Sequence, residues 1–375
     1  MNQVLLTGAT GTIGGALVPR LLKDPDTSLT LLVRAADDAG VTARLHEMLA
    51  FWQLHPCGEV AARINAVRGD ITLPGFGLVA KTLARLANEM TQIIHCAASV
   101  KLNMTLVEAR ATAVAPTRTV LEIGRSAARA GVLRKIDLVS TVGVWGRTPG
   151  VMPERPLPEV VDFHNTYEAA KAEAERVVWA EGEGLPITMH RPSMVVGETA
   201  TGRTIHFQVF YHLCEFLSGV RTFGVVPDLG LTRLDIVPVD WVADAICWAS
   251  SQEHTAGSIF HLCSGPHGAI ALPRLQERVR DTWRRHGRAV PRLRQIDRGL
   301  LERLVPMIGA LAGGKTRRAL RGLSPVLAYL AEDQGFSNAE TAVTLTTAGL
   351  PLPPVDSYLA SVLNFYLQQS FAPVA

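Results

Sequence analysis

The chain has 375 residues, of which 47% are hydrophobic and 19% are charged, and its formal net charge is +3. This length accommodates a doubly wound domain of about 200–250 residues together with a second region. No window of about 20 apolar residues is free of charges, and a strand pattern begins directly after Met1, so we expect neither a transmembrane helix nor a signal peptide. The five cysteines lack C-x-x-C spacing, which predicts reduced, buried thiols in a cytoplasmic protein without a structural zinc site.

A glycine-rich loop follows the first expected strand, over residues 4–6. Gly8, Gly11 and Gly14 lie between this strand and a helix that we expect to begin near Thr12. Glycine allows positive φ and a close approach of the backbone to a ligand, and a helix N-terminus offers free N–H groups and a positive dipole end. The setting predicts a loop that binds pyrophosphate, whereas a glycine triplet alone would fit an ordinary tight turn equally well.

The second expected strand, residues 28–35, indicates which dinucleotide is bound. Sites that prefer NAD usually end this strand with an acidic residue that accepts from the ribose 2′-OH. Here the strand ends in Val33 and Arg34, and Arg44 follows within a helical turn or two. Arginine binds a 2′-phosphate through charge-assisted hydrogen bonds, so we predict NADP(H), with Arg44 as a reinforcing ligand. The alternative is that Arg34 is a solvated cation at a strand end.

Strand and helix patterns then alternate along the chain. Further strands are expected over 64–72, 91–99, 134–146 and 186–197, and helices over 82–90, 117–131 and 165–182. This alternation predicts an α/β fold, a Rossmann-type doubly wound parallel sheet. Residues 1–200, with strands returning from about 232 to 265, would form the NADP-binding domain. Residues 201–231 and 266–375 would form a smaller, mostly helical substrate-binding region.

The ends of these strands carry the remaining candidate cofactor residues, because ligands bind outside the carboxyl ends of the strands in such sheets. Asp70 and Ile71 end the third strand, which is a fitting place for an adenine ring. Ala97, Ala98 and Ser99 end the next one and are small enough to admit a ribose or a nicotinamide.

Tyr167 and Lys171 are the candidate catalytic pair. Their spacing places them on one face of a helix, about one turn apart. A lysine cation stabilises the phenolate and brings a tyrosine closer to a working acid or base. Thr141, which follows the run IDLVS at 136–140, would orient a substrate oxygen. A Tyr-x-x-x-Lys spacing alone is common on helices, but here it follows the glycine loop and the strand-end residues in order.

These blocks together resemble the extended short-chain dehydrogenase/reductase superfamily, over about residues 1–265. Within it, three details resemble the thioester reductase and fatty acyl-CoA reductase branch. They are LLVRA at 31–35, IIHCAASVKLN at 93–103 and GETATGRT at 197–204. The segment 336–367 also looks like C-terminal segments of acyl reductases, although this match is looser.

The resemblance implies roles for further residues. Backbone groups of Thr10, Thr12 and Ile13 would contact the pyrophosphate, and Pro192 and Ser193 would line the nicotinamide carboxamide. Thr141 matches the catalytic Ser/Thr of the family, Tyr167 its acid, and Lys171 the residue that also holds the nicotinamide ribose. Two departures stand out. Ala113 replaces an asparagine often tied to the proton relay, and Trp145 stands where tyrosine is common.

The resemblance implies an NADPH-dependent reductase that converts an acyl thioester, on coenzyme A or a carrier, to an aldehyde, with an alcohol as the product of a second hydride. Such chemistry needs no metal. One alternative is an NADP-dependent ketone/alcohol oxidoreductase or nucleotide-sugar enzyme on the same scaffold, and another is an NADP-sensing protein without turnover. The apolar stretch 205–226 would serve as a wall for an acyl chain, or is simply buried structure.

A basic region spans residues 274–321, with fourteen Lys/Arg against four Asp/Glu. Such a surplus favours an anionic partner: a coenzyme A phosphate, an acyl carrier protein or, through peripheral contact, a membrane surface. The alternative is a solvated helical face. Nucleic acid is not expected, because no interleaved aromatic residues or nucleic-acid motif accompany the charges.

Overall fold

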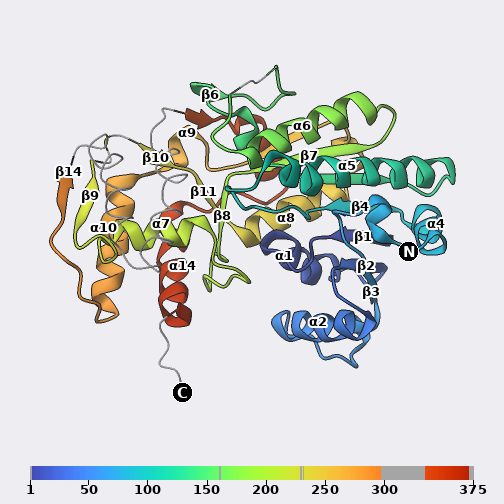
Figure 1. The fold of residues 1–375 in the computed structure, drawn as a ribbon, viewed down its shortest axis with the longest axis horizontal. Helices are drawn as coiled ribbons and strands as arrows, with labels where there is room; N and C mark the ends of the chain where they lie inside the picture. The colour runs from blue at the N-terminus through green and yellow to red at the C-terminus, as the bar shows by residue number, and fades with distance from the viewer. Residues whose placement is uncertain (1, 160–161, 229, 231, 297–333, 371–375) are drawn as a thin grey trace.

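The computed structural model describes residues 2–159, 162–228, 230, 232–296 and 334–370. Its centre is a seven-stranded sheet with strand order β12-β7-β5-β4-β1-β2-β3, in which every neighbouring pair is parallel (Figure 1). The strands are β1 (Asn2–Thr7), β2 (Thr27–Val33), β3 (Ile64–Arg68), β4 (Gln92–His95), β5 (Lys135–Val139), β7 (Ile187–Pro192) and β12 (Ile259–Leu262). The order reverses at β1, as in a Rossmann-type doubly wound sheet, which confirms the predicted fold class.

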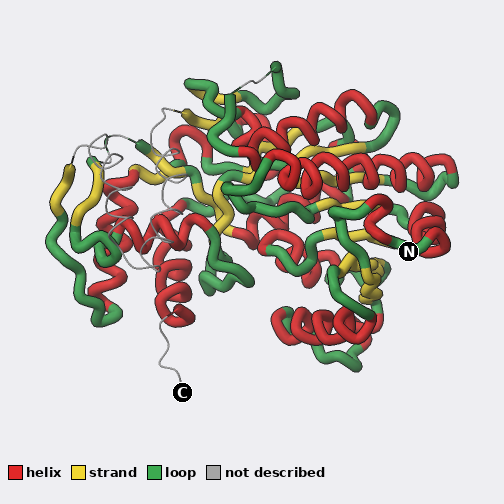
Figure 2. Tube along the Cα trace, viewed as in Figure 1, coloured by secondary structure: helices red, strands yellow, loops and turns green. Residues whose placement is uncertain are grey.

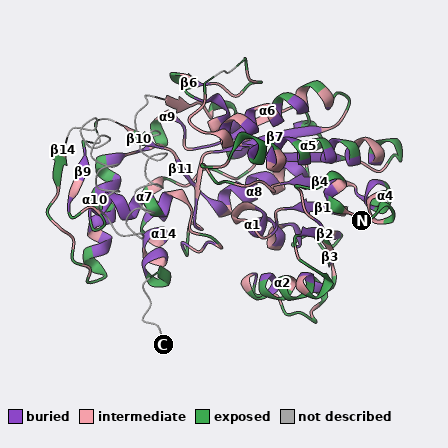
Figure 3. Cartoon of the chain, viewed as in Figure 1, coloured by how far each residue is buried: buried purple, intermediate pink, exposed green. Residues whose placement is uncertain are grey.

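Helices cover both faces of this sheet. One layer contains α1 (Thr12–Leu21), α2 (Asp38–Phe51) and α8 (Val239–Ser250), and the other contains α4 (Ala80–Glu89), α5 (Leu106–Arg129) and α6 (Thr166–Glu181). Side chains alternate along each strand, so Leu6 and Ile94 pack on the first layer while Leu5 and Ile93 pack on the second. In both layers, the residues that face the sheet are mostly buried and those that face away from it are mostly exposed (Figure 3).

A second lobe lies at the far end of the molecule from α4 (Figures 1 and 2). Its helices α7 (Val209–Leu217), α10 (Leu272–Arg285) and α14 (Val355–Ser370) share one apolar core. Short two-stranded pairs complete it: β8 (Met194–Val196) with β11 (Ile236–Pro238), β9 (Val225–Pro227) with β14 (Arg294–Ile296), and β10 (Arg233–Leu234) with β13 (Ile270–Ala271). Among the described residues this lobe is mostly helical, as expected.

Part of the C-terminal segment returns to the Rossmann domain. Strand β15 (Gln334–Phe336) pairs with β6 (Gly150–Met152), and α13 (Ala339–Thr347) follows it. The Glu154 carboxylate accepts hydrogen bonds from the backbone N–H groups of Glu340 (2.9 Å) and Thr341 (3.2 Å), which fastens the first turn of α13. Leu345 then packs into the core beneath α8.

Several expected boundaries were wrong. Helix α5 begins at Leu106, behind a capping box formed by Thr105 and Glu108, and it carries Pro116 inside rather than beginning after it. Strand β5 ends at Val139, because Thr141 already caps the 3-10 turn η2 (Val142–Trp145). Of the cysteines expected to be buried, Cys57 is exposed.

Two further expectations concern transmembrane helices and the basic region. None of the helices in the described ranges combines the length and apolar character that crossing a bilayer requires. Within the basic region, residues 297–321 lie outside the described residues, and α10 and β14 make up most of the described remainder.

Candidate active site

The glycine turn between β1 and α1 is pressed against the end of β4. Gly8 has φ +81°, and a β-carbon added there would lie 2.7 Å from the backbone nitrogen of Ala97. A β-carbon on Gly14 would lie 2.2 Å from the carbonyl oxygen of Gly8, and the N–H of Gly11 donates to this same oxygen at 2.8 Å. Glycine is therefore required at Gly8 and Gly14 to bring strand, turn and helix this close.

The first turn of α1 faces this glycine turn without a capping side chain. Gly11 is the N-cap residue, so no side chain accepts from the N–H groups of Thr12 and Ile13, and no acidic residue stands in the turn. Unpaired amides and the positive end of the helix dipole suit an anion. The turn thus fits the pyrophosphate of a dinucleotide, with Thr10 also in place beside it.

Three arginines gather where β2 and β3 end. Arg34 is exposed directly after β2, and the guanidinium of Arg44 donates to its carbonyl oxygen. Arg68, the last residue of β3, is paired in register with Val33 and donates to the carbonyl of Ala36 at 3.1 Å. Arg68 was not predicted from the sequence, because its place beside Arg34 depends on the pairing of β3 with β2.

The loop after β3 places Asp70 and Ile71 beside these strand ends. The Asp70 carboxylate accepts from the backbone N–H of Thr72 at 2.9 Å and from its hydroxyl at 2.8 Å, which stabilises the turn. Ile71 is half-buried against the apolar layer under α5. Both residues lie at the carboxyl edge of the sheet, where the adenine prediction requires them.

The end of β4 is tied to β1 by buried polar contacts. Nδ1 of His95 and the hydroxyl of Thr7 are 2.8 Å apart, and the N–H of Ala97 donates to this hydroxyl at 3.3 Å. Burial lowers the pKa of His95 to about 3, so its ring is neutral and its role is structural. Ala97, Ala98 and Ser99 are each only partly buried, so this strand end stays accessible beside the glycine turn.

Thr141, Tyr167 and Lys171 are brought together at the ends of β5 and α6. The Thr141 side chain hydrogen-bonds the Tyr167 phenol and also accepts from the N–H of Gly143 at 3.2 Å. The ammonium of Lys171 is buried and donates to the carbonyl of Val139 at 2.8 Å. The structure therefore brings Thr141 to Tyr167, and it holds the Lys171 ammonium at the end of β5, two residues before Thr141.

Electrostatics distinguish the two ionisable members of this group. Burial, and then the neighbouring Glu168 carboxylate, raise the pKa of Tyr167 above its ordinary value, so the phenol is protonated at neutral pH. Burial lowers the pKa of Lys171 to about 8, opposed by the nearby Cys96 and Glu175. A protonated phenol beside a lysine that is still largely cationic at pH 7 can donate a proton.

Pro192 and Ser193 lie where β7 leaves the sheet. Pro192 is buried, and the N–H of Ser193 donates to the carbonyl of Leu262 at 3.0 Å. The backbone N–H of Met194 donates to the carbonyl of Asp235 at 3.3 Å. The Asp235 carboxylate accepts from the N–H of Ser264 at 2.8 Å, and burial raises the pKa of this carboxylate. Asp235 thereby joins the ends of β7 and β12.

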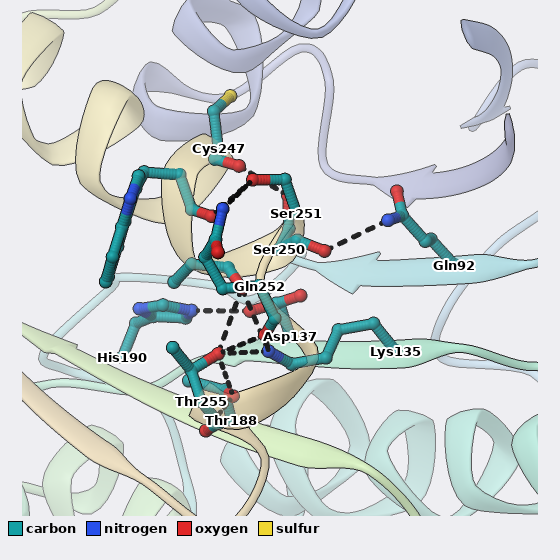
Figure 4. A network of polar contacts seen from close by, with 12 residues as sticks. Gln92, Lys135, Asp137, Thr188, His190, Cys247, Ser250, Ser251, Gln252 and Thr255 are labelled. Carbon is teal, nitrogen blue, oxygen red and sulfur yellow. Dashed lines mark hydrogen bonds and ion pairs between the residues drawn. The ribbon is translucent and has the colours of Figure 1, made fainter. Parts of the chain in front are cut away.

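A buried polar layer supports β5 and β7 from below (Figure 4). Nε2 of His190 lies 2.8 Å from Oδ1 of Asp137, and both side chains are fully buried. Lys135 donates to the carbonyls of Ala249 and Gln252, both at 2.9 Å, at the C-terminal end of α8. A cation at a helix C-terminus is favourable, so this layer fixes the strands that carry Thr141 and Pro192.

Known proteins are similar to this chain in sequence. Residues 6–246 match the model of the male sterility protein family of NAD-binding domains. An isonitrile lipopeptide synthase of Streptomyces coeruleorubidus is 32% identical over 267 residues, which are 71% of this chain and 18% of the synthase. Aldehyde reductase lnaA of Aspergillus flavus is 27% identical over 388 residues, which cover 98% of this chain and 36% of the reductase. The chain thus spans well under half of either relative.

Solved structures of other proteins are similar to this chain in fold. The terminal R domain from the myxalamid PKS-NRPS biosynthetic pathway superposes with a TM-score of 0.82 at 28% identity, over 99% of this chain and 91% of that one. A UDP-glucuronic acid 4-epimerase from Bacillus cereus shares the fold, with a TM-score of 0.65 at 15% identity over 98% of this chain and 99% of that chain. The chain therefore belongs to the male sterility protein family, within the extended short-chain dehydrogenase/reductase superfamily of NAD(P)-dependent oxidoreductases.

Proposed function

We propose that the chain is an NADPH-dependent reductase of acyl thioesters, which releases the acyl group as an aldehyde. The observation that carries the proposal is the contact of Thr141 with the Tyr167 phenol, with the Lys171 ammonium held at the end of β5, the strand that leads to Thr141. The relatives support it: one is called an aldehyde reductase, and a similar structure is a terminal R domain of a PKS-NRPS pathway.

The chain's own residues would polarise and protonate the reacting carbonyl. The Thr141 hydroxyl and the Tyr167 phenol would both donate to its oxygen, which is where negative charge develops during reduction. Tyr167 would then transfer its proton to that oxygen, and the Lys171 cation would stabilise the phenolate left behind. NADPH, when bound, supplies the hydride. Collapse of the resulting hemithioacetal expels the thiol and leaves the aldehyde.

The proposed preference for NADPH rests on charge at the end of β2. Arg34, Arg44 and Arg68 place three guanidinium groups there, where a 2′-phosphate would need them. The nearest acidic residue in sequence, Asp37, caps α2 by accepting from the N–H of Gly40 at 2.7 Å. Its carboxylate is thereby committed to the helix rather than offered to a ribose hydroxyl.

The second lobe would contact the carrier of the acyl group, whereas the 205–226 stretch, a candidate wall for the acyl chain, is largely buried structure. Helix α7, within the 205–226 stretch, packs Phe210, Leu213 and Leu217 into the lobe core rather than lining an open channel. The described part of the basic region, on α10 and β14, exposes Arg285, Arg292 and Arg294 at the outer end of the lobe. An acidic carrier protein would find complementary charge on this surface.

Turnover with defined thioesters tests the proposal. Purified protein is mixed with NADPH and a series of acyl-CoA thioesters, with the same acyl groups on a carrier protein as a second series. We expect one thiol released per NADPH oxidised if the aldehyde is the product, and one per two if the alcohol is. NADPH binding without thiol release in either series would contradict thioester reduction, and ketone reduction by the same protein would then favour the alternative oxidoreductase.

A further inference from the structure

The segment that follows β8 reaches back from the second lobe to the glycine turn. Nε2 of His206 donates to the carbonyl of Thr10 at 3.0 Å. The side-chain amide of Gln208 donates to the hydroxyl of Thr12 at 3.1 Å. Both contacts join positions 196 residues apart in the sequence, and both end on the turn whose fit to a pyrophosphate is described above.

These contacts are built into the lobe rather than made by a free loop. The ring of Phe207, between the two donors, packs on Tyr211 and Tyr366 with ring centroids 4.9 Å away in each case. Gln208 is the N-cap residue of α7, yet its side chain does not cap that helix and is directed to Thr12 instead. The segment is therefore held by the lobe core through Phe207 and by the glycine turn through its neighbours.

A cavity of about 150 Å³ lies between α1 and the part of the segment that precedes the two donors. Thr12 and Gly15 line it from the helix, and Arg203 and Ile205 line it from the segment. The Arg203 guanidinium stacks over the ring of Phe51 at 4.2 Å and marks the far side of this space. The segment is thus fastened to α1 at points rather than packed solidly against it.

Both side chains carry N–H groups at the place where an anion would sit. Thr10 and Thr12 flank the uncapped Gly11, and no acidic residue occupies the first turn of α1. An N–H donor that bonds a carbonyl or hydroxyl of the turn can turn to a phosphate oxygen, which is the stronger acceptor. We infer that His206 and Gln208 are cofactor ligands contributed by the second lobe, which bind the pyrophosphate of the dinucleotide and couple its binding to the start of α7.

This inference rests on the proposed dinucleotide site but not on the chemistry, so binding is measured without turnover. The dissociation constant of NADPH is determined by fluorescence titration for the wild type, His206→Ala, Gln208→Ala and the double variant. We expect each single variant to bind about tenfold more weakly, as befits loss of one hydrogen bond to a charged group. His206→Gln keeps a donor and should recover part of the affinity. His254→Ala removes an exposed histidine on the 3-10 turn η3 (Glu253–Thr255) and should bind as the wild type does.

The affinity for a fragment of the cofactor shows whether the two side chains bind the pyrophosphate or whether their replacement disturbs the whole site. Adenosine 2′-monophosphate carries the 2′-phosphate but has no phosphate at the 5′ position, so its affinity should fall less than that of NADPH in both variants. NADPH dissociation constants within twofold of the wild type would overturn the inference, as would equal weakening of NADPH and the fragment. If the wild type binds NADPH but reduces no thioester, only the proposed function fails.

Discussion

The ammonium of Lys171 donates a hydrogen bond to the carbonyl oxygen of Val139 at 2.8 Å, so helix α6 is fastened to the last residue of β5. Thr141 stands two residues beyond that carbonyl, and Tyr167 stands one helical turn before the lysine. This single contact sets the register between the two elements that carry the proposed catalytic hydroxyls. It also buries the cation that would stabilise the phenolate.

The buried position of Lys171 predicts a pH dependence. Because burial lowers the pKa of this ammonium to about 8, its charge is lost as pH rises through that value. The rate of reduction in single turnovers should therefore fall above about pH 8. Lys171→Arg stays charged, so its rate, although lower overall, should show no decline there. A wild-type profile that is flat from pH 7 to 9 would contradict the proposed role of the charge.

The same shift affects stability in the opposite direction. The unfolded chain holds this proton up to about pH 10.4, whereas the folded chain releases it near pH 8. Between these values the unfolded state binds more protons, so Lys171 makes folding more favourable as pH rises. Denaturant titrations give the unfolding free energy of each protein. The value for the wild type minus that for Lys171→Met should rise from pH 7 to pH 10.

The arginines at the ends of β2 and β3 predict a change in cofactor preference. Replacing Arg34, Arg44 or Arg68 with alanine should weaken NADPH binding by about tenfold or more while leaving NADH binding within about twofold, since only NADPH carries the 2′-phosphate. Arg118→Ala removes an exposed arginine paired with Glu181 on the opposite layer and serves as the control. Equal losses for both cofactors would contradict a 2′-phosphate site.

Gly14 should tolerate no side chain. A β-carbon there would lie 2.2 Å from the carbonyl oxygen of Gly8, so Gly14→Ala must push the helix off the turn. We expect a loss of about 1–3 kcal/mol in unfolding free energy and NADPH binding at least tenfold weaker. Gly335→Ala is the matched control, because its nearest neighbour atom would be 3.6 Å away. A Gly14→Ala protein with wild-type affinity would show that the close packing is not needed for binding.

Glu175 and Arg191 form a buried ion pair one helical turn beyond the lysine. Nη2 of Arg191 and Oε2 of Glu175 are 2.5 Å apart, and these side chains are 0% and 2% exposed, respectively. The Arg191 guanidinium lies 5.9 Å from the centre of the Trp145 ring. Removing one partner leaves an uncompensated buried charge, so Glu175→Ala should cost about 3–5 kcal/mol in unfolding free energy. Replacing both residues by apolar ones of similar size should recover most of this.

A surface pair gives the comparison for that measurement. Glu181→Ala breaks the exposed contact with Arg118 and should cost at most about 1 kcal/mol. Equal costs for the two glutamate variants would contradict the difference that burial is expected to make.

The parallel sheet could be predicted because apolar strand patterns, helix patterns and glycine turns can each be recognised from a short stretch of sequence. Strand ends were less predictable, since β5 stops at Val139 only because the side chain of Thr141 caps the following turn. The start of α5 was misjudged because Pro116 is tolerated inside this helix, which packs against α6. A local signal was present, since Thr105 and Glu108 have the spacing of a capping box.

The candidate site divides in the same way. Tyr167 and Lys171 were predicted because both lie on one helix at a known spacing. Arg68 and His206 were not, because each reaches its place through pairing with a segment remote in sequence. Residues of that kind can be found only once strand order and lobe packing are known.

The most direct measurement compares wild type and Tyr167→Phe in single-turnover reduction of an acyl thioester by NADPH, with the cofactor dissociation constant measured in parallel. Phenylalanine keeps the ring but removes the proposed acid. We predict a rate about 10²–10⁴-fold lower with unchanged NADPH affinity. An unaltered rate would contradict the assignment of Tyr167 as the proton donor and, with it, the proposed chemistry of the site.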